Sequence, residues 1–352
     1  MPHPLPPWIA RQLAQLLPRP GHAWLLQGPS GLGQFELALA LAAAWLCDAP
    51  TPQGACGQCP GCHGLRVHTH ADFALLMPEA QMLERGWPLP EKAQAEIDEK
   101  KRKPSKEIRV EALRDTIEFA QRTSARGRGK VVLICPAERM NAIAANTLLK
   151  TLEEPPGDVR FVLATQAAHL LLPTIRSRCM AHTLAWPDAA EALQWLAGQG
   201  LHETAAAALL QAAGGRPAVA LQMARPAVAE AKKTKAAPAD GQQAAAAWAH
   251  LPKALAQGDA AALADLPLAE TVARLQKLCA DLMAVQTGAP PRFFAVADLP
   301  ARPVSLPALA RWWGQLAQAA RSAEHPLNAG LALEYLASSA RQALNSATRA
   351  TN

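Results

Sequence analysis

Short, nearly continuous apolar runs alternate with longer segments of helical period in the first half of the chain. Runs of this kind, without polar alternation, are typical of strands buried on both faces of a parallel sheet. The predicted strands are 22–26, 72–76, 130–134 and 160–165, and the predicted helices are 5–17, 35–46, 108–121 and 141–152. This alternation predicts an α/β domain in which helices flank a parallel sheet.

The second half of the chain lacks such runs and is rich in Ala, Leu and Trp, which favours helices. A length of 352 residues suggests two or three domains. Neither a signal peptide nor an apolar run of about 18 residues is evident, so we expect a cytoplasmic protein. The net charge of +6 permits contact with nucleic acid without arguing for it. The charged stretch 81–107 is expected to be a mobile surface insertion, and its role cannot be inferred.

A glycine-rich turn follows the first predicted strand. Gly28, Gly31 and Gly33 have the spacing of the phosphate-binding loop G-x-x-x-x-G-K-[ST]. Gln34 stands where that loop has its phosphate-binding lysine, and Phe35 stands where it has a magnesium-binding hydroxyl. This pattern indicates a nucleotide-binding fold without its nucleotide chemistry; a glycine turn of unrelated origin is the alternative.

A second nucleotide motif is also altered. In active ATPases of this type an Asp-Glu pair follows the strand that corresponds to 130–134. Here Cys135 and Pro136 occupy those two positions. Glu138 lies two residues further on, outside the position of the pair. The sequence therefore predicts degenerate loop and carboxylate motifs together.

Four cysteines form the densest candidate metal site. Two C-x-x-C steps share their middle cysteine, and a fourth cysteine lies nine residues upstream: the set is Cys47, Cys56, Cys59 and Cys62. This spacing is typical of tetrahedral Zn²⁺ coordination, and four thiolates would close a structural site. His63 and His68 are rival ligands. A redox dithiol is the other alternative, disfavoured because four clustered cysteines exceed one pair.

Four segments resemble a known family. The stretches A-A-N-T-L-L-K-T-L-E-E-P-P (144–156), F-V-L-A-T (161–165) and T-I-R-S-R-C (174–179) are similar to bacterial clamp-loader subunits of the AAA+ class. The stretch H-A-W-L-L-Q-G-P-S-G-L-G (22–33) resembles their first strand and phosphate loop. The four cysteines resemble their zinc module. The similarity covers about residues 1–185 well, and the remainder only by its helical character.

The resemblance implies the domain organisation. Residues 1–185 would form the AAA+ domain with a zinc module at 47–62, and 186–229 a helical lid. A linker at 230–243, itself indicated by its polar composition, would precede an α-helical collar domain at 244–352.

The resemblance also implies a role. Active members of the family keep the loop lysine and the Asp-Glu pair, from which this chain departs at Gln34, Phe35, Cys135 and Pro136. It therefore implies a non-hydrolysing, stationary member of a hetero-pentameric ring with tau/gamma-type ATPase subunits and a delta subunit. Such a ring opens a sliding clamp and places it on primed DNA. The order of the subunits cannot be inferred, nor whether the loop retains a nucleotide or this chain contacts DNA itself.

One arginine is implied to act in trans. In the family the S-R-C arginine, here Arg178, reaches the ATP of the neighbouring subunit. The alternative is an arginine that ties the loop to its own domain, and Arg176 is expected to be of that kind. Two alternative functions remain open. One is an ATPase with atypical site residues, which positions 34, 35, 135 and 136 oppose. The other is a zinc-dependent DNA-binding module, which lacks the expected basic recognition helix after the cysteines.

Overall fold

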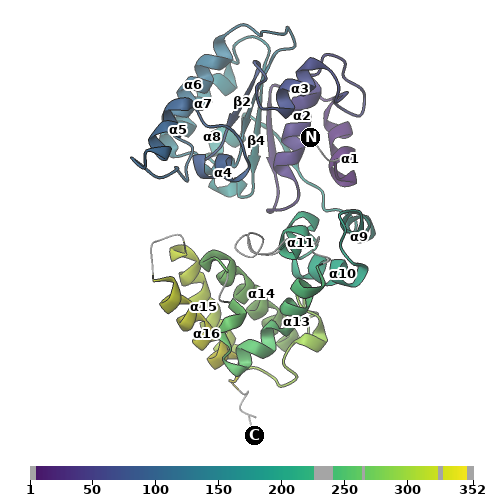
Figure 1. Ribbon diagram of the computed structural model, residues 1–352, viewed down its shortest axis with the longest axis vertical. Coiled ribbons are helices and arrows are strands. Elements are labelled where there is room, and N and C mark those ends of the chain that lie inside the picture. Colours follow the sequence, from purple (N-terminus) through teal and green to yellow (C-terminus); the bar gives the residue numbers. More distant parts are fainter. Residues whose placement is uncertain (1–4, 226–240, 264–265, 324–327, 347–352) are drawn as a thin grey trace. The chain divides into compact units, whose positions relative to one another are not determined.

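The structure is a computed structural model that describes residues 5–225, 241–263, 266–323 and 328–346 (Figure 1). The chain divides into two compact units, Met1–Trp186 and Pro187–Asn352. Most of the predicted linker at 230–243 lies outside the described residues, which resume at Gly241.

A five-stranded sheet forms the centre of the first unit. Its strand order is β2-β3-β4-β1-β5, and every neighbouring pair is parallel. The strands are β1 (Ala23–Gln27), β2 (Phe73–Leu76), β3 (Lys130–Ile134), β4 (Val159–Thr165) and β5 (Met180–Thr183). The predicted α/β class and parallel sheet are confirmed, whereas the edge strand β5 was not predicted.

Helices cover both faces of this sheet, with α1 and α2 on one side and α6 and α7 on the other (Figure 1). Leu113 of α6 and Leu148 of α7 pack with Phe161 of β4 in a core from which water is excluded. The helices are α1 (Pro7–Leu16), α2 (Gln34–Trp45), α3 (Pro60–Arg66), α4 (Glu79–Glu84), α5 (Glu91–Asp98), α6 (Val110–Gln121), η1 (Ala137–Arg139), α7 (Ala142–Glu153), η2 (Ala168–Leu170) and α8 (Pro173–Arg176). The helices α2, α6 and α7, which lie between successive strands in the chain, thus bury their apolar faces against the sheet.

The charged stretch 81–107 is more regular than its sequence suggested. It contains most of α4 and all of α5, and one arginine ties the two helices together. Arg102 donates to Glu79 at 2.8 Å and to Glu96 at 2.7 Å. Trp87 is only 8% exposed and stacks on His68, with ring centroids 3.6 Å apart. These contacts attach the stretch to the domain.

The second unit consists of helices around two apolar clusters. One cluster joins α9, α10 and α11, and the other joins the helices from α13 onward. Trp312 lies inside the second cluster, whereas its neighbour Trp313 is 41% exposed. The elements are α9 (Ala189–Gly198), α10 (Glu203–Ala212), α11 (Pro217–Ala224), α13 (Gln242–Gln257), η3 (Ala260–Leu263), α14 (Leu268–Gln286), η4 (Val296–Asp298), α15 (Leu306–Ser322) and α16 (Ala329–Leu344). Among the described residues, no helix combines the length and the apolar character that a membrane span requires.

Candidate functional site

The phosphate-loop-like turn connects β1 to α2. Gly33 is the residue before α2 and has a φ of 102°, in the left-handed region that favours glycine. A Cβ at Gly33 would lie 2.6 Å from Cδ1 of Ile9 in α1. The turn is therefore packed closely against α1, and a larger residue at position 33 would be strained as well as crowded.

The side chain of Gln34 turns back onto this loop. Its amide nitrogen donates to the carbonyl oxygen of Gly28 and, at 2.8 Å, to that of Pro29, and the residue is only 5% exposed. In a working phosphate loop, backbone N–H groups surround the phosphates and a lysine adds positive charge. Here an uncharged amide satisfies two carbonyl groups of the turn instead. The side chain of Gln34 therefore stabilises the loop through hydrogen bonds within it.

Phe35, the next residue, lies among aromatic and cationic groups. The guanidinium carbon of Arg85 is 4.5 Å from the Phe35 ring centroid, and Trp87 meets the ring edge-on at 6.5 Å. A phenyl ring has no oxygen to offer a hard cation such as Mg²⁺. Arg85 and Phe35 instead form a cation–π contact.

The positions of the missing Asp-Glu pair are apolar. Cys135 is 9% exposed, and burial raises the pKa of its thiol to about 12, so the group is neutral near pH 7. The nearby carboxylate of Glu138 accepts hydrogen bonds from Thr165 Oγ1 at 2.6 Å and from the Gln166 backbone at 3.1 Å. Glu138 therefore links the ends of β3 and β4. These contacts satisfy both of its oxygens within the protein.

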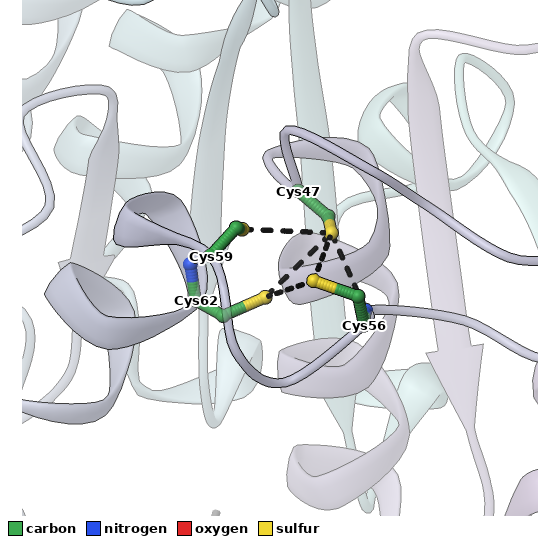
Figure 2. A group of neighbouring side chains, drawn as sticks. All are labelled: Cys47, Cys56, Cys59 and Cys62. Atoms are coloured by element: carbon green, nitrogen blue, oxygen red, sulfur yellow. Dashed lines mark hydrogen bonds between the residues drawn. The ribbon is translucent and has the colours of Figure 1, made fainter.

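The four predicted cysteines come together in one cluster (Figure 2). Their sulfur atoms all lie within 4.8 Å of one another. The shorter separations are 3.4 Å for Cys47–Cys56, 3.6 Å for Cys47–Cys62, 3.8 Å for Cys47–Cys59 and 4.0 Å for Cys56–Cys62. Tetrahedral Zn²⁺ with Zn–S distances of about 2.3 Å requires sulfurs roughly 3.8 Å apart. The donor type, number and spacing all fit zinc.

Local backbone geometry positions these thiols. Cys47 follows α2, and its sulfur accepts from the Cys56 backbone at 3.3 Å. Cys59 precedes α3 and caps it by accepting from the Cys62 backbone at 3.4 Å. A Cβ at Gly61 would lie 2.8 Å from the carbonyl oxygen of Leu46, so glycine permits the close approach of α3 to the end of α2.

The thiols differ in acidity. Hydrogen bonds from the backbone of Gln58 and Cys59 lower the pKa of Cys56 to about 6, whereas burial raises the pKa of Cys62 to about 12. Metal ligation requires thiolates. Binding of a cation here would therefore release protons and would strengthen as the pH rises.

Arg178 is held by its own domain. Its guanidinium donates to Glu153 Oε1 at 3.0 Å and to the carbonyl oxygen of Thr174 at 3.1 Å. The side chain is 31% exposed, and its Nε is buried without a partner among the described residues. Arg176, on the preceding turn, is exposed. Glu153 therefore fixes the direction of the Arg178 fork.

One polar cluster was missed from the sequence. The carboxylate of Asp72, which is 0% exposed, accepts from the backbone of Ala125 at 2.7 Å and of Arg126 at 2.9 Å. It also accepts from Ser124 Oγ at 3.0 Å and Lys130 Nζ at 3.2 Å. The available signal was an aspartate directly before an apolar strand, and nothing in the pattern indicated its partners.

The fold and the loop define a class. A parallel sheet with a glycine turn between β1 and α2, followed in the chain by a helical unit, is the α/β architecture that the sequence predicted. A DNA polymerase III gamma subunit-related protein from Thermotoga maritima has a similar fold, with a TM-score of 0.50 and 17% identity; the match covers 95% of this chain and 99% of that one.

The family follows from sequence comparison. Residues 10–187 match the family model described as DNA polymerase III, delta subunit, and the chain belongs to this family. The delta-prime subunit of Pseudomonas aeruginosa is 40% identical over 221 residues, or 62% of this chain and 60% of that protein. The delta-prime subunit of Escherichia coli is 33% identical over 223 residues, with the same shares.

Similarity also extends to a second type of subunit. The tau subunit of Escherichia coli is 33% identical over 159 residues, which are 45% of this chain and 21% of that protein. The matches to the two delta-prime subunits span about 60% of the length of each. The resemblance to clamp-loader subunits is thus confirmed at the level of the family.

Proposed function

We propose that this chain is the delta-prime subunit of a DNA polymerase III clamp loader and that it hydrolyses no ATP itself. In this proposal it is the stationary member of a hetero-pentameric ring with tau/gamma-type ATPase subunits and a delta subunit. The ring loads the sliding clamp onto primed DNA. The observation that carries the proposal is the Gln34 amide, which occupies the carbonyl groups of the loop where a lysine would bind phosphate.

The chain lacks the charged groups on which hydrolysis of ATP depends. Phosphoryl transfer depends on a loop lysine, a hydroxyl that binds Mg²⁺, and acidic residues that hold the metal and position water. The corresponding residues here are Gln34, Phe35, Cys135 and Pro136. None of them is charged near pH 7, so the chain lacks the electrostatic stabilisation on which this chemistry depends.

The cysteine cluster is proposed to hold one structural zinc ion. The four ligands would be Cys47, Cys56, Cys59 and Cys62. Bound zinc would hold residues 47–62, the cysteine knuckle, in a fixed fold and would supply no other chemistry. A closed tetrahedral shell leaves no position for water or substrate, in contrast to catalytic zinc sites.

Arg178 is proposed to act on ATP bound by the neighbouring subunit, as an arginine finger. Arginine is always charged, and its planar fork can bind two phosphate oxygens at once. The side chain is 31% exposed, which supports the proposal because a phosphate of another subunit can approach it. The contacts with Glu153 and Thr174 belong to the alternative, in which Arg178 ties the loop to its own domain.

Nucleotide titration and an ATPase assay of the purified chain test the proposal. We expect no Mg²⁺-dependent hydrolysis above background, for the wild type and for Gln34→Lys, because one lysine restores neither the metal ligand nor the acidic pair. When reconstituted with its ATPase partners, the wild type should support clamp loading. Robust turnover by the isolated single variant would overturn the assignment of the second motif, and failure to support clamp loading would overturn the proposed role.

A further inference from the structure

We propose that Arg126, paired with Asp48, is a positioning residue for the metal-loaded cysteine cluster. Asp48 would link the cluster to Arg126, and Arg126 would offset the negative charge and join the cluster to the edge of the sheet. This inference rests on the proposed zinc site. Arg126 is 79 positions from the first cysteine, and nothing in the spacing of the cysteines points to it.

Asp48 touches the cysteine knuckle in two places besides its bond to Cys47. Its backbone N–H donates to the Cys59 sulfur at 3.4 Å. Its carboxylate Oδ2 accepts from the Gly61 backbone at 3.2 Å. Hydrogen bonds to ligand atoms, and to the backbone between ligands, orient a metal site from outside. Asp48, which follows Cys47 directly, therefore connects that cysteine to Cys59 and to the backbone between Cys59 and Cys62.

Arg126 grips the Asp48 carboxylate with two nitrogens. Its Nη2 lies 2.8 Å from Oδ2 and its Nε 3.3 Å from Oδ1, the two-point geometry that distinguishes arginine from lysine. The backbone of Arg126 is in turn fixed, because its N–H donates to the buried carboxylate of Asp72 at 2.9 Å. The arginine is thus anchored at the loop that leads into β3.

The Asp48–Arg126 pair also affects the net charge around the metal-loaded cluster. Four thiolates around Zn²⁺ carry a net charge of about −2. The carboxylate of Asp48 adds a third negative charge beside the cluster. The guanidinium of Arg126 offsets that charge. Removing Arg126 alone would leave Asp48 as an unpaired anion next to an anionic metal site.

The experiment measures zinc affinity by chelator competition on the full-length chain. We expect Arg126→Ala to weaken zinc binding about 10–100-fold, the usual cost of losing an outer partner of a metal site. Arg126→Lys should recover only part of the loss. Arg122→Ala is the matched control, because Arg122 lies on the same loop and its side chain pairs with the exposed Glu118 rather than with Asp48. The zinc affinity of this variant should equal that of the wild type.

A double variant separates the charge argument from simple loosening of the loop. Asp48→Asn combined with Arg126→Ala should bind zinc more tightly than Arg126→Ala alone, because the unpaired anion is gone. If Arg126 only stabilised the fold, the double variant would bind zinc no more tightly than Arg126→Ala, because removing the anion would not restore the lost stability.

The outcomes are distinct. Wild-type-like zinc affinity of Arg126→Ala, or an equal loss in Arg122→Ala, would overturn the inference. A double variant that binds no more tightly than Arg126→Ala would overturn the charge argument. A wild-type chain that binds no zinc at all would instead refute the proposed metal site on which the inference rests.

Discussion

Glutamine and lysine have similar lengths, so position 34 differs from a working phosphate loop mainly by one charge. The amide uses that length to reach the carbonyl oxygens of Gly28 and Pro29. A cationic side chain in the same place would be free to meet phosphate oxygens only if it left those carbonyls. The residue therefore both removes a phosphate ligand and stabilises a loop conformation that needs none.

Asp72 gives a pH-dependent contribution to stability. Burial by itself raises the pKa of this carboxyl. The hydrogen bonds from Ala125, Arg126, Lys130 and Ser124 outweigh that effect and hold the pKa below its ordinary value of about 3.9. A carboxyl with a depressed pKa stabilises the fold above the ordinary value, and its contribution is lost as the pH falls through the folded-state pKa.

We therefore expect Asp72→Asn to destabilise the protein by about 3 kcal/mol at pH 7, because it leaves the buried Lys130 ammonium without its anion. The difference from the wild type should shrink below about pH 4. Urea unfolding from pH 3 to pH 7 measures both effects. The exposed Asp115→Asn is the control and should follow the wild type; a difference between wild type and Asp72→Asn that does not change with pH would contradict the assignment.

Among the four cysteines, we expect Cys59 to contribute most to zinc binding and to the local fold of residues 47–62. Its thiol belongs to both C-x-x-C steps, caps α3 and accepts from the Asp48 backbone. Cys59→Ser should therefore lower bound zinc from about one ion per chain to near zero and should loosen residues 47–62, since metal binding and local folding are coupled.

Elemental analysis of protein purified without added metal measures the first effect, and protection of backbone amides from hydrogen exchange measures the second. Cys179→Ser is the control, because that thiol is outside the cluster, and it should keep its zinc. A wild-type protein with no bound metal would contradict the prediction outright.

The main elements of the first unit were predictable because strands buried in a parallel sheet have nearly continuous apolar sequences. The positions of the loop and the knuckle were predictable from the spacing of the glycines and the cysteines. β5 escaped prediction because it is an edge strand of Met180–Thr183, mostly exposed, without an apolar pattern. The helices α4 and α5 escaped because ion pairs to Arg102 stabilise them. The hydrogen bonds from Gln34 to the carbonyl groups of Gly28 and Pro29 depend on how the loop folds back on itself, which the spacing of residues along the chain does not show.

At the scale of the whole molecule, the proposed role of this chain is exerted on a neighbour. Arg178→Ala should leave folding, zinc content and ring assembly nearly intact while lowering clamp-stimulated ATP turnover and clamp loading. A supplied arginine is worth about 10³–10⁵ in rate at the site it serves. The loss in total turnover should be smaller, because only one ATP site of the ring depends on this chain.

ATP turnover and clamp loading by the reconstituted ring measure this effect. Arg178→Lys should recover part of the activity, since a single ammonium cannot reproduce the two-point fork. Arg176→Ala is the matched control and should behave as the wild type. Unchanged rates for Arg178→Ala would show that this arginine serves only its own domain through Glu153.

The helix α2 sets the distance between the two sites that define the first unit. It begins at Gln34 on the loop, and the first cysteine follows two residues after its end. Twelve residues at about 1.5 Å each separate the two ends by about 18 Å, far beyond any metal–ligand bond. A cation in the knuckle therefore has no direct access to a phosphate at the loop.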